Sequence, residues 1–225
     1  VSAGDWLAVE DGKPAAVKLA IGTTTLDGQP REATGTLTVS RLVQPAAVAR
    51  GDLVGGHGGP RPMPMRGRRG GALVAPKPTK PDPADVNTWA VGELVTTEKI
   101  TTDKVTGKAE ATATLAAGIY KAVFEIPAKG DVPAVRTETV LEVVDPQAAK
   151  YGVRRAFVMR AKAASVEPNA EFTGFVGTGY DAGRALVEIA QAGQTLARFW
   201  TEPGRTQWPV SLKVTDAHRG GFTVR

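Results

Sequence analysis

The sequence predicts an all-β protein built from two antiparallel β-sandwiches in tandem. Short runs of apolar residues alternate with polar ones, which is typical of half-buried strands. Glycine and proline are abundant, with 26 and 16 residues, and they supply turns between such strands. The chain has 225 residues and is 42% hydrophobic. This length allows one large domain or two of ordinary size, and the hydrophobic content is enough to bury cores.

The first sandwich is expected over residues 1–146. Its expected strands cover residues 6–10, 17–21, 35–43, 108–115, 119–126 and 135–144, with an irregular strand pair over 91–100. Leu37 and Val39 alternate with polar residues, so they are predicted to lie in the core. Thr106-Gly107 is predicted to close a hairpin.

The segment 115–120, Leu-Ala-Ala-Gly-Ile-Tyr, is typical of a tyrosine corner. In such a corner the tyrosine hydroxyl bonds to the backbone a few residues upstream. Tyr120, Ala122, Phe124 and Ile126 are expected to face one way along the following strand. The corner indicates a Greek-key sandwich.

Residues 147–154 are expected to connect the first sandwich to a second one over residues 155–225. The expected strands of the second sandwich cover residues 157–163, 171–176, 185–189 and 196–200, with a last strand opened by Gly220-Gly221-Phe222. A tight turn at Ala192-Gly193 is predicted to join the strands 185–189 and 196–200.

The second sandwich is predicted to lack its last strand. Gly221-Phe222 occupies the place that residues 118–120 hold in the first half, where the strand Val135–Val144 follows. The second half shows no counterpart of that strand. Its edge is expected to be exposed, or to be filled by the segment 51–87 or by a neighbouring molecule.

Residues 51–87 are rich in glycine and proline and are expected to form a long disordered insertion. The basic residues in it are Arg61, Arg66, Arg68, Arg69, Lys77 and Lys80. Because much of the net charge of +5 comes from this stretch, no broad basic face and no nucleic-acid partner are expected. An insertion without a role is the favoured interpretation of this stretch, and the alternatives are a protease-sensitive loop and, less favoured, an RNA contact.

Four groups of residues in the second half carry a resemblance to a known family. They are Gly177-Thr178-Gly179-Tyr180, Gly183-Arg184-Ala185 with Glu188-Ile189, Phe199-Trp200-Thr201-Glu202, and Arg219-Gly220-Gly221-Phe222. With them the stretch 157–225 resembles the bacterial alpha-2-macroglobulin family, and the first half resembles it more weakly. The resemblance implies macroglobulin-type domains, which are immunoglobulin- or fibronectin-III-like sandwiches strung along a very large protease inhibitor. It also implies a secreted or periplasmic location, and the start at Val1 is expected to be a processed or excised end.

The chain contains no cysteine. This excludes disulfides, a cysteine nucleophile and cysteine-based zinc sites, and it leaves the compartment undecided. It also excludes the Cys-Gly-Glu-Gln thioester with which many members of the resembled family trap proteases. The two histidines, His57 and His218, lie far apart, so no zinc site is expected. No catalytic, cofactor-binding or metal-binding residue is assigned.

Two polar patterns allow a chemical interpretation beside a structural one. Gly177-Thr178-Gly179 could cradle a phosphate, but no helix follows it, so a tight bend is favoured. Asp181, Glu188 and Glu202 could supply a catalytic carboxylate pair, but the favoured interpretation is that they point to solvent or pair with an arginine. The arginines expected to meet them are Arg184, Arg198 and Arg205.

Phe199, Trp200 and Trp208 could form a platform on which sugars stack. Packing in a core or between domains is the favoured interpretation, because large aromatic side chains dominate such contacts.

The sequence therefore predicts a non-catalytic structural and interaction segment of an alpha-2-macroglobulin-like endopeptidase inhibitor. Its expected partners are other domains of the same large chain and, indirectly, target proteases. No small-molecule substrate and no cofactor are expected. The alternative is a pair of adhesive or carbohydrate-binding modules of a cell-surface protein.

Overall fold

A computed structural model describes residues 1–50, 82–128, 130 and 133–225. Most of the expected insertion, including His57 and the basic residues between 61 and 80, lies outside the described residues. The insertion is expected to extend to residue 87. In the structure, residues 82–85 already form a turn, and the 3-10 helix η1 (Val86–Thr88) follows it directly. The Trp89 side chain follows and is anchored here, because its Nε1 donates to the Pro83 carbonyl at 2.8 Å.

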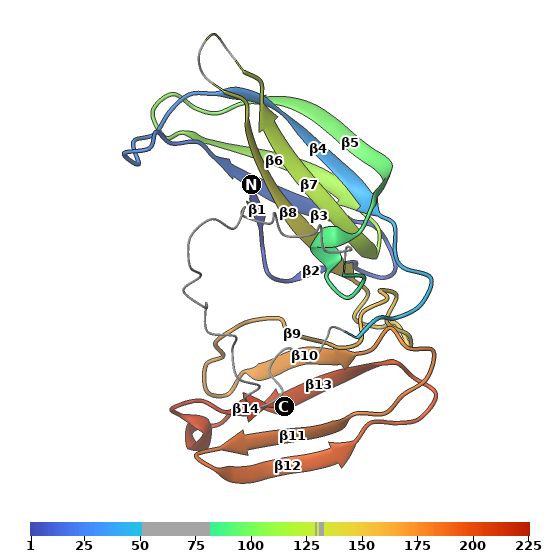
Figure 1. Ribbon diagram of the computed structural model, residues 1–225. Coiled ribbons are helices and arrows are strands. Elements are labelled where there is room, and N and C mark those ends of the chain that lie inside the picture. The colour runs from blue at the N-terminus through green and yellow to red at the C-terminus, as the bar shows by residue number, and fades with distance from the viewer. Residues whose placement is uncertain (51–81, 129, 131–132) are drawn as a thin grey trace, which may run out of the picture.

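The all-β class is confirmed, and the first half of the chain forms two facing sheets (Figure 1). The three-stranded sheet has the order β1 (Ser2–Ala3), β3 (Ala15–Gly22), β6 (Lys108–Leu115). The five-stranded sheet has the order β2 (Leu7–Ala8), β8 (Val135–Val144), β7 (Gly118–Ile126), β4 (Thr34–Leu42), β5 (Val91–Thr101). All neighbours are antiparallel except β2 and β8, which run parallel. We call this pair of sheets the first sandwich.

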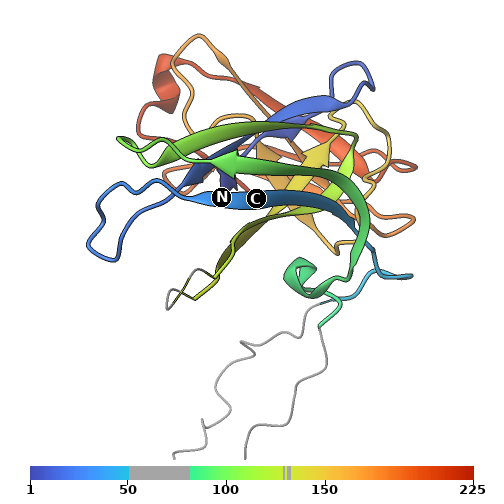
Figure 2. The ribbon, with the colours of Figure 1, turned by 90° about the horizontal axis from the view of Figure 1, so that it is seen from above.

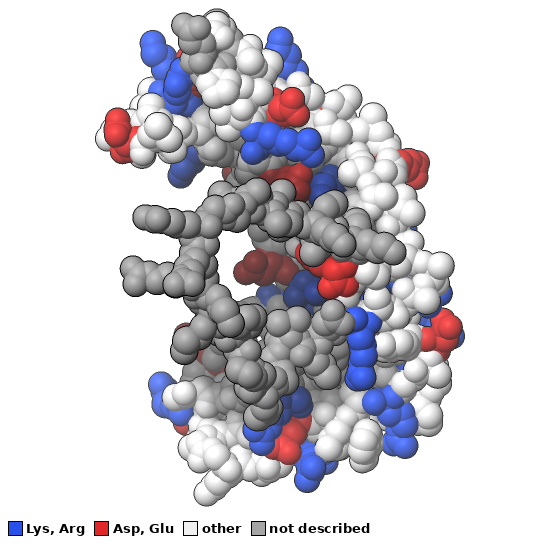
Figure 3. Space-filling model, in the orientation of Figure 1, with Lys and Arg blue, Asp and Glu red and all other residues white. Residues whose placement is uncertain are grey.

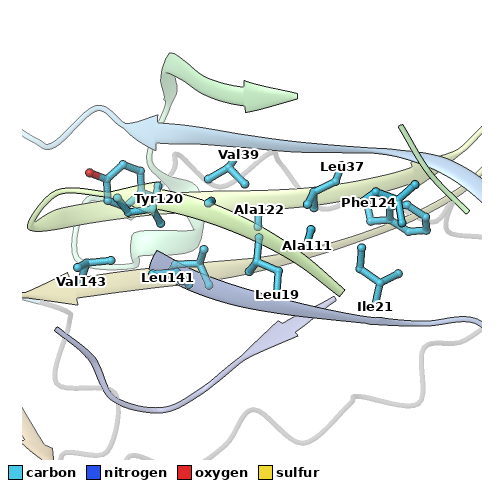
Figure 4. Packing of buried hydrophobic residues seen from close by; sticks show 14 of the residues in the cluster. Leu19, Ile21, Leu37, Val39, Ala111, Tyr120, Ala122, Phe124, Leu141 and Val143 are labelled. Carbon is cyan, nitrogen blue, oxygen red and sulfur yellow. The ribbon is translucent and has the colours of Figure 1, made fainter. Parts of the chain in front are cut away.

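The core of the first sandwich takes side chains from both sheets (Figure 4). Leu19 and Ile21 come from β3, and they face Leu37 and Val39 of β4 across the interior. The predicted burial of Leu37 and Val39 is confirmed. Every second side chain along each strand points inward. Short strands with only every second residue apolar are therefore enough to build this core.

The tyrosine corner is also confirmed. The Tyr120 hydroxyl donates to the Ala116 carbonyl at 2.9 Å, and the ring is buried in the first core. Ala122 and Phe124 lie in the same core, as the alternation predicts. Burial raises the pKa of the Tyr120 hydroxyl, so the hydroxyl keeps the proton that it donates.

Two predictions for the region 91–107 are wrong. Residues 91–101 form one strand, β5, whose irregularity comes from register shifts against β4 rather than from a break into two strands. Thr106-Gly107 closes no hairpin, because β5 and β6 belong to opposite sheets and the loop between them crosses the sandwich. Asp103 organises this loop: the Thr106 backbone N–H donates to its carboxylate at 2.7 Å and lowers the pKa of that carboxyl.

The second half also forms two facing sheets, which we call the second sandwich. One has the order β13 (Gln207–Lys213), β10 (Glu171–Gly177), β9 (Val158–Ala161). The other has the order β12 (Gln194–Trp200), β11 (Leu186–Gln191), β14 (Thr223–Val224). Their common core contains Val176, Val187, Trp208 and Val210. The predicted turn is confirmed, since Ala192 and Gly193 both have positive φ and join β11 to β12.

The sequence reasoning missed β13. Trp208 and Val210 alternate there with outward residues, but Pro209 argues against a central strand. The strand is compatible with Pro209 because β13 lies at the edge of its sheet. A proline there can direct its missing N–H toward the open side, where no neighbouring strand needs a hydrogen bond.

The two sandwiches are stacked, with the first above the second in Figure 1 and overlapping it when seen from above (Figure 2). Their strands correspond in order and pairing. β9, β10 and β13 repeat the arrangement of β1, β3 and β6, and β14, β11 and β12 repeat that of β7, β4 and β5. Within the described residues nothing pairs with the outer edge of β14, where the first sandwich has β8.

Candidate functional site: the junction between the sandwiches

An apolar cluster lies where the two sandwiches meet. Ile119 and Val144 contribute from the outer face of the five-stranded sheet, and Tyr151, Val153 and Phe175 contribute from the connector and the second sandwich. All five side chains are buried. The connector residues 147–154 are thus part of a packed interface rather than a free linker.

The strand β8 serves both cores because its side chains alternate. Leu141 and Val143 point into the first core, whereas Val140 and Val144 pack in the junction cluster. Glu142 lies between the last two on the junction face.

Glu142 is the polar centre of the junction, and only 6% of its side chain is exposed. Its carboxylate accepts hydrogen bonds from the Tyr151 hydroxyl, from Arg155 Nη1 at 2.8 Å and from Arg160 Nη2 at 3.3 Å. Tyr151 lies in the connector, Arg155 directly follows it and Arg160 lies in β9, so one carboxylate of the first sandwich binds one group of the connector and two of the second sandwich. A buried carboxylate requires such partners, because its desolvation is costly.

Burial and the neighbouring Glu142 charge raise the pKa of the Tyr151 hydroxyl. Tyr151 therefore remains a neutral donor rather than a base or nucleophile at neutral pH. A cavity of about 540 Å³ opens beside this group and is lined by residues of both sandwiches, including Asp5, Glu142, Arg155 and Arg160. Figure 3 shows acidic and basic side chains gathered in the hollow between the sandwiches.

The glycine motif 177–179 belongs to the same junction. The Thr178 N–H donates to the Thr206 carbonyl at 2.9 Å, and the Gly179 N–H donates to the Arg155 carbonyl at 2.7 Å. These amides are thus already satisfied by the backbone and are not free to bind a phosphate. A Cβ on Gly179 would lie 2.3 Å from the Val153 carbonyl oxygen, so the motif permits close approach of the connector.

The three predicted carboxylates are used in different ways. Asp181 pairs with Arg154 at 3.0 Å, a partner that the sequence reasoning did not propose. Glu188 pairs with Arg225 and, at 3.6 Å, with the expected Arg198. The hydrogen bond from the Arg225 side chain holds the pKa of Glu188 below its usual range.

The third carboxylate and the remaining arginines contribute elsewhere. Glu202 gives its backbone carbonyl to Trp208. Arg184 donates to the Thr201 carbonyl at 3.0 Å, and Arg205 donates to the Gln207 carbonyl at 3.2 Å. Neither arginine therefore has the carboxylate partner that was expected of it. Among the described residues no group of three or more His, Asp or Glu side chains could hold a metal ion.

The favoured interpretation, core or inter-domain packing of Phe199, Trp200 and Trp208, holds for only one of the three, and they do not form a single platform either. Trp208 is 5% exposed in the second core and donates from Nε1 to the Glu202 carbonyl at 2.9 Å. Trp200 is 59% exposed, and the Arg184 guanidinium lies 5.5 Å from its ring centroid. Core packing is thus the role of Trp208 alone, while Trp200 and the half-exposed Phe199 face solvent.

His218 has a local structural role. It ends the short 3-10 helix η2 (Asp216–His218), where its Nδ1 accepts from the Thr215 N–H at 2.9 Å. Its ring packs edge-on against Phe222, with ring centroids 6.1 Å apart.

Sequence reasoning missed the Glu142 cluster entirely. Alternation along β8 placed Glu142 on the face opposite the core, where solvent is the default expectation. One signal for the burial of Glu142 was available in the sequence. Val140 and Val144 lie on the same face of β8 as Glu142, and two valines on a face indicate that another part of the protein covers that face.

No protein-family model matches the chain, and no curated protein matches it. Within the described residues no helix has the length and apolar character that a membrane crossing requires. The resemblance to alpha-2-macroglobulins therefore depends on the residues quoted above alone.

Proposed function

We propose that the chain is a non-catalytic structural and interaction segment of a secreted or periplasmic alpha-2-macroglobulin-like endopeptidase inhibitor. In this proposal both sandwiches are macroglobulin-type domains of the immunoglobulin/fibronectin-III-like kind. The observation that carries it is the junction. Glu142 and the apolar cluster join one sandwich to the next through a buried interface, as a scaffold of serial domains requires.

The polar groups support a scaffold role over a chemical one. Glu142 is surrounded by two arginines and a tyrosine hydroxyl, so its oxygens are occupied. Glu188, which is 14% exposed, is likewise engaged by Arg198 and Arg225. A general base needs a free lone pair directed at a substrate, and these carboxylates direct theirs at partners within the fold.

The proposal is tested on the native protein that contains this chain, captured from its source with antibodies against the chain. The captured protein is mixed with trypsin, and trypsin activity is measured on a small chromogenic peptide and on a large protein substrate. A trapping inhibitor leaves the small substrate accessible and excludes the large one, so only hydrolysis of the large substrate should fall. Trypsin with a blocked active-site serine is the control. Because it cannot cleave the captured protein, it should not be trapped and should not stay bound to the captured protein. Unchanged hydrolysis of both substrates would refute the proposal.

One observation favours carbohydrate binding as a second candidate function. The exposed Trp200 ring with Arg184 beside it is a surface on which a sugar ring can stack. In a pull-down with insoluble polysaccharides, Trp200→Ala should abolish retention if this candidate is right. Phe157→Ala is the matched control, since Phe157 is equally exposed, at 61%. Equal retention of both variants and the unaltered chain would reject a role for Trp200.

A further inference from the structure

The second sandwich has an open groove where the first sandwich has a strand. In the first sandwich β8 lies between β7 and β2, antiparallel to the former and parallel to the latter. The counterpart of β7 is β14, and the counterpart of β2 is the segment 164–166, which follows β9 as β2 follows β1. Between β14 and 164–166 the structure shows a cavity of about 510 Å³.

The groove is lined by apolar side chains and, at its margin with η2, by the polar residues Thr215, His218 and Arg219. Phe172, Phe222 and Val224 lie along it together with Met159 and Val166. Met159 is 43% exposed. A smaller cavity of about 70 Å³ continues inward over Met159, Phe172 and Val224 toward the core residue Val210. In the first sandwich Leu141 and Val143 of β8 cover the corresponding face of the core.

The backbone along the groove is also prepared for pairing. Glu188 and Arg225 exchange both of their N–H···O bonds, at 2.7 and 2.9 Å. In an antiparallel ladder the hydrogen-bonding direction alternates with each residue, so Val224, paired with Ile189 between such positions, directs its N–H and C=O away from β11. The N–H and C=O of Val224 thus face the open edge.

We propose that this groove is an acceptor site for one extended strand that pairs with the open edge of β14 and runs antiparallel to it. The strand carries apolar side chains at alternate positions, as β8 does, and pairs on its other side with the segment 164–166. Phe222 and Val224 correspond to Tyr120 and Ala122, because Ile189 pairs with Val224 as Val39 pairs with Ala122.

This correspondence fixes the chemistry of the incoming strand. Leu141 lies opposite Tyr120 in β8, so a leucine-sized side chain is expected opposite Phe222. The residue two positions further along the strand covers the inner part of the groove, as Val143 does opposite Gly118. The inference depends on the strand arrangement alone and not on the proposed inhibitor function.

The test adds the missing strand in the register that β8 defines. Because Arg225 corresponds to Val123, a copy of the sequence of residues 124–144 is appended directly after Arg225. The control has the same appended copy with Leu141→Asp and Val143→Asp in the copy only, which keeps length and strand alternation and removes the apolar face. The unextended chain is the reference.

The apolar extension should raise the midpoint of thermal unfolding of the second sandwich by about 5 °C or more. It should also slow hydrogen exchange of the Val224 amide by at least about tenfold. The control extension should produce neither change. If both extensions leave melting and exchange unchanged, the groove does not accept a strand. If both stabilise equally, apolar pairing in the groove is not the cause, and the proposal is likewise overturned.

Discussion

Replacing Glu142 with glutamine tests whether the buried cluster joins the sandwiches energetically. Glutamine keeps the size of the side chain but removes the charge that attracts Arg155 and Arg160. Hydrogen bonds to a charged group are worth about 1.5–3 kcal/mol, against about 1 kcal/mol between neutral groups. Three such bonds are weakened, and the two arginines are partly exposed, at 29% and 40%, so solvent screens part of the loss. The expected cost is about 2 kcal/mol.

Asp181→Asn is the control, because Asp181 also pairs with an arginine at the junction, Arg154, at 3.0 Å. Its side chain is 91% exposed, so its replacement should cost only about 0.5 kcal/mol. For a domain pair of this size about 1 kcal/mol shifts the melting temperature by about 2–4 °C. Calorimetry at pH 7 should therefore show a fall of about 4–8 °C for Glu142→Gln and about 1–2 °C for the control. Equal shifts for the two variants would refute the assignment of Glu142 as the polar centre of the junction.

Three further outcomes are expected. Tyr120→Phe removes the corner hydrogen bond and should lower the free energy of unfolding by about 1 kcal/mol in urea titrations; no change would show that the corner bond is not stabilising. Gly179→Ala forces a Cβ to 2.3 Å from a backbone oxygen, so it should cost about 2 kcal/mol or more, whereas Gly183→Ala, whose nearest atom is at 3.4 Å, should be tolerated. The pKa of Tyr151 is raised by burial above its ordinary value, so its stabilisation is complete below about pH 10 and is lost as the pH rises further. Denaturant titrations from pH 8 to 12 should accordingly show a steeper alkaline loss for the unaltered chain than for Tyr151→Phe, and parallel curves would contradict the buried donor.

The fold was largely predictable because its strands alternate. The strand Val135–Val144 and the inward residues Leu37 and Val39 follow from the period of two alone. The loop 102–107 was misread because a turn dipeptide signals only that the chain turns, not whether it returns to the same sheet or crosses to the opposite one. That choice depends on long-range pairing of β5 with β4 and of β6 with β3.

The site was harder to predict than the fold. Trp208 and Trp200 both lie on edge strands, but Trp208 points into the second core, whereas Trp200 pairs with Leu186 on the face of its sheet opposite the core residue Val187. Glu142 has no local signal for burial, since its partners Tyr151 and Arg160 belong to the connector and the second sandwich. Local pattern assigns a residue to one face of a strand, and only the packing of one sandwich on the next decides what covers that face.

The junction and the open groove are connected through the role of β8. In the first sandwich this strand completes the core with Leu141 and Val143, and its other face presents Glu142 to the second sandwich. A strand seated in the groove beside β14 would occupy the same place, so its inner face would close the second core and its outer face would be presented outward beside β14. If the groove is filled as proposed, the strand that completes a sandwich is also the strand that offers the contact surface to the next one. The extension experiment tests this as well. In the appended copy, the glutamate that corresponds to Glu142 should be solvent-exposed on the completed second sandwich. Replacing this copied glutamate with glutamine should therefore leave the melting temperature unchanged, in contrast to the same replacement at Glu142 itself.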